Sequence, residues 1–95
     1  MTRQPKPPIR PTRATRRVLL ALLSGAGNLS GYPISCAAQV GSGRVYTILN
    51  QLERAGWAAS DWGPETGFGR RRFYRLTARG RYHGLKMLGL EDGDA

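Results

Sequence analysis

Three polar side chains in residues 43–55 have the types and spacing with which a helix reads DNA. Arg44, Thr47 and Asn50 recur every three residues and therefore share one face of a helix. Arginine can donate two hydrogen bonds to guanine, and asparagine can pair with adenine in the major groove. We predict that these side chains face base edges, although Asn50 is equally well explained as an exposed polar residue. The apolar residues recur at i, i+3, i+4 and i+7 on the opposite face: Val45, Ile48, Leu49 and Leu52.

Two hydroxyl groups at the start of this segment suit contacts to the DNA backbone. Ser42 can cap the helix, and its side chain, like that of Tyr46, can donate a hydrogen bond to a phosphate oxygen. Such contacts position a helix without reading sequence. For Tyr46 an equal alternative is a half-buried packing role.

A run of three arginines, Arg70, Arg71 and Arg72, follows a loop at residues 63–69 that is dense in turn-forming residues. The segments on both sides of the loop have strand composition, which predicts a hairpin. Adjacent guanidinium groups at the end of a hairpin can reach phosphates or a narrow minor groove. The alternative, a charged strand edge that prevents aggregation, would be served by fewer charges. We therefore predict DNA contact here.

The remaining segments predict helices that support these two clusters. Thr15 can cap a first helix that is apolar nearly all round and ends at Ser24 and Gly25. A second helix is predicted to start near Pro33, because proline is tolerated in a first turn, and to stop at Gly41. Its predicted inner face consists of Ile34, Cys36, Ala37 and Val40.

A last helix is predicted from a cap at Thr77 to about Leu90, interrupted by three glycines. A helix followed by a basic hairpin is the plan of a winged helix-turn-helix. The sequence thus predicts an α+β fold with a three-helix core, a two-stranded β wing and a short C-terminal helix. The residues expected to pack between strands and helices are Trp57, Trp62, Tyr74 and Leu76, whereas His83 is expected to be exposed.

The charge of the chain favours a polyanionic partner. Its 95 residues carry a formal net charge of +9, and residues 1–52 contain no Asp or Glu. Residues 1–14 hold four prolines and four basic residues without a hydrophobic period, which predicts a flexible basic arm or, equally, a solvated tail. Residues 15–82 would form the DNA-binding domain, and residues 83–95 the end of the last helix and an acidic tail. The candidate arm contacts are Arg10, Arg13, Arg16 and Arg17.

Several classes of function are disfavoured by what the chain contains. Cys36 and His83 are the single cysteine and histidine, so an internal disulfide is excluded and no metal or other cofactor is expected. We expect Cys36 to be a small buried thiol. The chain lacks a nucleophile paired with a base, so we do not expect an enzyme. The longest apolar run is too short for a membrane span, which favours a cytoplasmic, nucleoid-associated protein.

The order and spacing of several short motifs across residues 18–82 resemble the PadR-like transcriptional regulators. The motifs are Leu20 to Leu23, Gly31 with Tyr32, Gly43 to Leu49, Leu52 with Glu53, Ala55 with Gly56, Arg70 to Thr77, and Gly80. This resemblance implies a winged-helix DNA binder, usually a repressor that acts as a homodimer. In the family a long C-terminal helix supplies much of the dimer contact and, in some members, an effector site.

The last helix of this sequence departs from that pattern, because it is short, interrupted by glycine and followed by an acidic tail. A small-molecule effector is therefore not expected. A homodimer would use the narrow apolar stripe of Tyr82, Leu85 and Leu88. The function predicted is that of a sequence-specific regulator of transcription that binds double-stranded DNA, in the manner of a repressor. The alternative is an architectural, recombination-associated or RNA-binding protein with little sequence preference.

Overall fold

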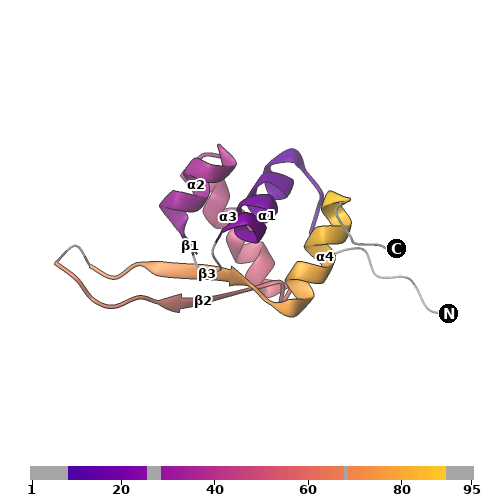
Figure 1. The fold of residues 1–95 in the computed structure, drawn as a ribbon. Helices are drawn as coiled ribbons and strands as arrows, with labels where there is room; N and C mark the ends of the chain where they lie inside the picture. The colour runs from indigo at the N-terminus through magenta and orange to yellow at the C-terminus, as the bar shows by residue number, and fades with distance from the viewer. Residues whose placement is uncertain (1–8, 26–28, 68, 90–95) are drawn as a thin grey trace.

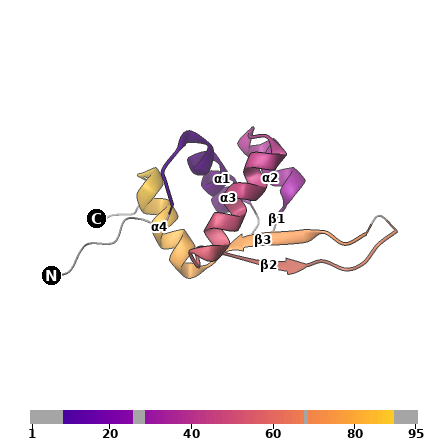
Figure 2. The same ribbon diagram turned by 180° about the vertical axis from the view of Figure 1, so that it is seen from behind.

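The computed structural model describes residues 9–25, 29–67 and 69–89 of the chain. Helices α1 to α3 lie over one face of a small antiparallel sheet, and the hairpin of β2 and β3 projects beyond them (Figures 1 and 2). Helix α4 stands at the end of the molecule away from the hairpin tip. This arrangement confirms the predicted α+β winged-helix fold. The elements are α1 (Arg13–Ser24), β1 (Leu29–Ser30), α2 (Gly31–Ala38), α3 (Ser42–Arg54), β2 (Ala58–Trp62), β3 (Arg72–Leu76) and α4 (Ala78–Leu88).

Helix α1 begins earlier than the sequence suggested. Thr12, in an extended conformation, is its N-cap and accepts a hydrogen bond from the backbone N–H of Thr15 at 3.1 Å. The expectation that Thr15 caps this helix is wrong, because Thr15 lies inside the first turn and is buried. Four apolar residues then face the core: Val18, Leu19, Ala21 and Leu22.

Helix α2 starts at Gly31, near the predicted position, and ends at Ala38 rather than at Gly41. Its inner face is formed by Ile34 and Ala38, which are four residues apart and therefore lie on one side. Cys36 is two positions from each of them, so its thiol points to solvent and the prediction of a buried thiol is wrong. Ala37, which was also predicted for the inner face, is exposed.

Helix α3 carries the predicted apolar face: Val45, Ile48, Leu49 and Leu52 are all buried. It begins at Ser42, and its N-cap is Gly41, which makes no side-chain hydrogen bond. The prediction that Ser42 caps the helix is therefore wrong, since Ser42 is already the first helical residue. α3 packs against α1, α2 and β2, so its position is set on three sides.

The sheet has the order β1-β3-β2. The hairpin predicted from sequence is present, with Ala58 opposite Leu76 and Trp62 opposite Arg72. Pairing continues past the strands, because the N–H of Gly63 donates to the carbonyl of Arg71 at 2.7 Å. Strand β1, which pairs with the outer edge of β3, was not predicted from sequence.

Helix α4 is capped by Thr77, as predicted, through a hydrogen bond from the N–H of Gly80 at 3.0 Å. A Cβ atom at Gly80 would collide with the backbone carbonyl of Trp57, so glycine allows the closest approach of α4 to the start of β2. His83 stacks on Trp57, with ring centroids 5.1 Å apart and planes 9° from parallel. The expectation that His83 is a simple exposed residue is therefore wrong.

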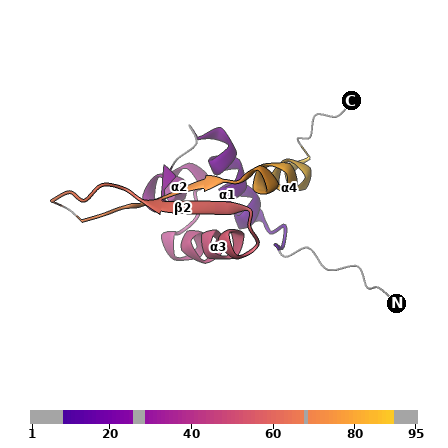
Figure 3. The same ribbon diagram turned by 90° about the horizontal axis from the view of Figure 1, so that it is seen from below.

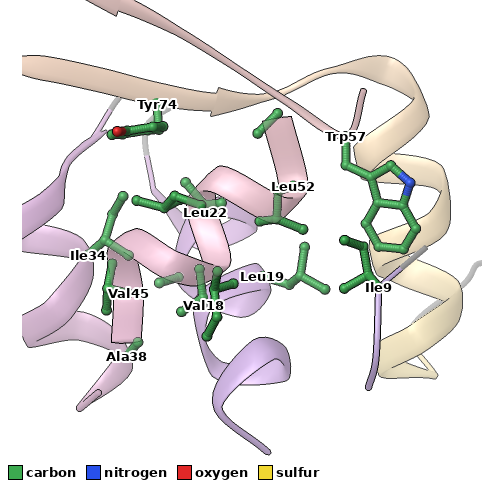
Figure 4. Close-up of a cluster of buried hydrophobic side chains, with 14 residues drawn as sticks. Ile9, Val18, Leu19, Leu22, Ile34, Ala38, Val45, Leu52, Trp57 and Tyr74 are labelled. Carbon is green, nitrogen blue, oxygen red and sulfur yellow. The ribbon is translucent and has the colours of Figure 1, made fainter. Parts of the chain in front are cut away.

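The core lies between the helices and the sheet and extends to the segment before α1. Ile9 is 1% exposed and lies beside Trp57, as Figure 4 shows. The predicted arm at residues 1–14 is thus shorter than expected at its carboxyl end, because Ile9 is buried and α1 starts at Arg13. Residues 1–8 of that arm lie outside the described residues. Tyr74 is buried as predicted, and Leu76 packs half-buried against the core.

Candidate nucleic-acid interface

The exposed face of α3 is divided into a centre and two edges. Successive residues of a helix are about 100° apart, so residues seven apart nearly coincide on its surface. Arg44 and Gln51 therefore form one edge. Tyr46 and Glu53 form the other. Thr47, Asn50 and Arg54 lie between these edges, and all three are exposed.

The first edge of α3 faces the start of α1 across a surface rich in arginine. Arg10, Arg44, Thr47 and Gln51 line a depression of about 480 Å³. An adjacent depression of about 400 Å³ is lined by Arg13, Arg17 and Arg44, among others. Arg16 lines neither of them. Because residues 1–52 contain no acidic side chain, the positive charge of this edge is not neutralised from within α1, α2 or most of α3.

The second edge of α3 faces the wing, which runs alongside it (Figure 3). Tyr46 shares a groove of about 420 Å³ with Tyr32, Trp62 and the three wing arginines. The predicted arginine cluster and Tyr46 of α3 therefore line one concave surface. We call this surface the wing groove; its full lining is Ser30, Gly31, Tyr32, Tyr46, Trp62, Arg70, Arg71, Arg72 and Tyr74.

Arg72 differs from its two neighbours because it is held by partners inside the protein. Its Nε donates to Ser60 Oγ at 2.8 Å, and its Nη2 lies 3.8 Å from Glu53 Oε2. Ser60 in turn donates to the same carboxylate oxygen at 2.6 Å. Glu53 is in the last turn of α3, so this network ties α3 to both strands of the wing.

Arg70 and Arg71 are exposed at the rim of the wing groove. In the part of the chain that the structure describes, neither forms an ion pair. Arg71 is consequently available to phosphate oxygens, whereas the Nε of Arg70 already donates to the carbonyl of Gly63 at 3.4 Å. Arg75, by contrast, is paired with Asp61 at 2.6 Å on the other face of the hairpin.

Trp62 is not the packing residue that the sequence suggested, since 53% of its surface is exposed. It occupies the last position of β2, beyond the helices that bury Trp57. The guanidinium carbons of Arg72 and Arg70 lie 5.0 and 5.6 Å from the centre of its ring, within the range of cation–π attraction. Trp62 therefore supports the wing arginines rather than the core.

Tyr32 and Tyr46 form the helical wall of the wing groove. Tyr46 is 49% exposed, and its ring covers Gly31 so closely that a Cβ atom there would collide with it. This contact, made by the hydroxyl end of the ring, agrees with the half-buried alternative. The neighbouring Cys36 thiol raises the pKa of the Tyr32 phenol above its usual value, chiefly through a side-chain hydrogen bond. Sequence reasoning missed Tyr32 and Trp62 as surface residues of this site, because aromatic composition alone favours a core position.

The proposed dimer stripe on α4 is only partly exposed. Tyr82 is at the surface, Leu85 is half-buried, and Leu88 packs against the core of its own chain. Within residues 9–25, 29–67 and 69–89, no group of three or more His, Cys, Asp or Glu side chains could hold a metal ion. None of the helices described is long and apolar enough to cross a membrane.

Comparison with solved structures shows the same fold in bacterial regulators. A PadR family transcription regulator from Eggerthella lenta is 23% identical, with a TM-score of 0.67 over 81% of this chain and 72% of that one. A PadR family transcription regulator from Clostridium difficile is 22% identical, with a TM-score of 0.66 over 76% of this chain and 79% of that one. PcaV of Streptomyces coelicolor, solved with its natural ligand, is 25% identical with a TM-score of 0.69, over 83% of this chain and 53% of its own.

The chain thus spans about half the length of PcaV. No match to a curated protein was found. The model of the transcriptional regulator PadR-like family matches residues 19–84, which is more than half of the chain and includes α2, α3 and the wing. This protein therefore belongs to the PadR-like family of transcriptional regulators.

Proposed function

We propose that the protein is a sequence-specific regulator of transcription, acting as a repressor, that places α3 in the major groove of double-stranded DNA. Arg44, Thr47 and Asn50 would face base edges, while Ser42 and Tyr46 would bond the backbone. The wing, at residues 63–72, would lie on the backbone or in the minor groove. Arg10, Arg13, Arg16 and Arg17 would extend the contact on the other side.

The observation that carries this proposal is the position of α3 between two arginine-rich surfaces. Its exposed centre holds Thr47 and Asn50, and the edge beside them holds Arg44. The two edges adjoin Arg10 and Arg13 on one side and Arg70 and Arg71 on the other. Phosphates flank a major groove on both sides, so cations are needed at both edges of a helix that enters it. Membership of a family of transcriptional regulators supports the same function.

Competition binding separates sequence reading from general attraction to DNA. A duplex is enriched from a random-sequence pool by repeated binding, and its affinity is compared with that of random duplex at several salt concentrations. We expect Arg44→Ala to lower the ratio of the two affinities by about 5- to 150-fold, the equivalent of roughly 1–3 kcal/mol for a bidentate base contact. A ratio near one for the unmodified protein would contradict sequence-specific regulation and favour architectural binding.

The same titration tests the wing. Each phosphate contact contributes about 0.9 to the slope of log affinity against log salt, so replacing both Arg70 and Arg71 with alanine should reduce that slope by about 1.8. Arg81→Ala, which removes an exposed arginine on α4, is the matched control and should leave the slope unchanged. An unchanged slope in the wing variant would remove Arg70 and Arg71 from the interface.

A further inference from the structure

Three aromatic side chains stand exposed around the wing groove. Tyr32 is 75% exposed, and Tyr46 and Trp62 are each about half exposed. All three line the same groove. Aromatic side chains bury a large apolar area when they are packed, so three rings left in water around one groove indicate a surface that receives a partner.

The same groove also carries positive charge. Arg70 and Arg71 reach its rim, and neither forms an ion pair within the described residues, whereas Arg72 is shared with Glu53. The groove therefore combines exposed aromatic rings with two arginines that have no carboxylate partner among the described residues, although Arg70 also lies over the ring of Trp62 and donates to the carbonyl of Gly63 at 3.4 Å. Its volume of about 420 Å³ is within the roughly 300–1,000 Å³ usual for sites that enclose a small molecule or a part of a polymer.

The backbone of a duplex would use only half of these groups. In a duplex the bases are stacked on one another, so a protein meets base edges and phosphates but not base faces. The phosphates of a duplex would pair with the arginines, but no base face would be available to stack on the aromatic rings. An unpaired nucleotide offers both, because its base face can stack on tyrosine or tryptophan while its phosphate accepts hydrogen bonds from arginine.

We propose that the wing groove binds unpaired nucleotides of single-stranded DNA, with Tyr32 and Trp62 as stacking surfaces and Arg70 and Arg71 as phosphate ligands. Tyr46, whose ring packs against Gly31, forms the helical wall of the groove. This inference rests on the proposed DNA-binding function and adds a second form of DNA that the same surface takes. It places the single strand beside α3, so the protein would favour DNA whose duplex is interrupted next to the wing.

The test uses the full chain and dye-labelled probes. The first is an oligothymidylate of about 12 nucleotides, a length within the roughly 4–16 nucleotides covered by single-strand-binding folds, and the second is an abasic oligomer with the same number of phosphates. We expect the oligothymidylate to bind about 5- to 150-fold more tightly, the equivalent of roughly 1–3 kcal/mol for one stacked base. It should also quench the fluorescence of the exposed Trp62, since Trp57 is buried.

Substitutions at Tyr32 identify the groove as the site. Tyr32→Leu should remove most of the preference for the oligothymidylate over the abasic oligomer, and Tyr32→Phe, which keeps the ring and loses only the hydroxyl, should retain it. Arg81→Ala is the control, because Arg81 is an exposed residue on α4 that lies outside both the groove and the predicted dimer stripe. Retention of the preference in Tyr32→Leu, or its loss in Arg81→Ala, would overturn the assignment to this groove.

The two proposals fail in different ways. Equal affinity for the oligothymidylate and the abasic oligomer would overturn the single-strand site and leave the enriched duplex and its dependence on Arg44 untouched. Failure to enrich any duplex, together with a base-dependent affinity that Tyr32→Leu abolishes, would overturn sequence-specific regulation and support the single-strand site.

Discussion

The three consecutive arginines of the wing differ in what surrounds them. Arg72 points back toward α3, where Ser60 and Glu53 hold it, while Arg71 points to solvent. The difference follows from their positions, because Arg72 is the first residue of β3 and pairs with Trp62, whereas Arg71 precedes the strand. Arg72 is consequently a positioning residue, and Arg71 is free to contact a ligand.

Substitution at these two positions should separate stability from binding. Arg72→Ala removes the hydrogen bond to Ser60 and leaves Glu53 without its cation, so we expect the free energy of unfolding to fall by about 1 kcal/mol. Arg71→Ala should change it by less than about 0.5 kcal/mol and weaken binding to random duplex. Urea unfolding of both variants measures the first effect. Equal stability of the two variants would show that the network contributes nothing.

Residue types alone predicted the exposed face of α3 better than its surroundings. Arg44 and Asn50 are exposed as predicted, since the helical period fixes which residues cannot face the core. Trp62 and His83 were mispredicted, because the burial of an aromatic ring depends on how far a strand extends beyond the helices and on which ring it meets. Both depend on tertiary structure and leave no pattern in the neighbouring sequence.

At the scale of elements, four helices and the wing hairpin followed from periodicity and turn composition, whereas β1 did not. Its two residues, Leu29–Ser30, are too few to show alternation, and they form a strand only because the edge of β3 is available to them. The caps of α1 and α3 were displaced by one to three residues for a similar reason. Several serines, threonines and glycines adjoin each start, and the packing of the helix decides which of them becomes the cap.

Two glycines of α4 should respond in opposite directions to the same substitution. Gly80→Ala places a methyl group against the backbone carbonyl of Trp57, and we expect it to destabilise the fold by about 1–3 kcal/mol. Gly84→Ala meets Leu19 at 3.5 Å and Leu23 at 4.0 Å, which are ordinary contacts, so its better helix propensity should stabilise the fold by up to about 1 kcal/mol. Thermal unfolding of the pair is the measurement. A Gly80→Ala variant as stable as Gly84→Ala would contradict the close approach of α4 to β2.

At the scale of the whole molecule, the proposed repressor requires two copies to cover two half-sites. We predict a homodimer formed through Tyr82, Leu85 and the exposed part of Leu88. Tyr82→Glu should convert it to a monomer, because the substitution places a charge on the most exposed residue of that stripe, which is not part of the core. Light scattering at micromolar concentration gives the mass, and footprinting gives the number of half-sites. Tyr32→Glu, at an exposed tyrosine far from α4, is the control and should leave the mass unchanged.

The contacts of the Glu53 carboxylate bear on which DNA sequences the proposed regulator would prefer. It joins the last turn of α3 to both strands of the hairpin, so the spacing between α3 and the wing is set by contacts within the protein. If α3 and the wing bind a duplex as proposed, that spacing would be fixed before binding. A duplex whose grooves match that spacing fits without bending, while a stiffer or wider one must be deformed at an energetic cost that depends on its sequence. Selectivity should therefore extend to base pairs that no side chain touches.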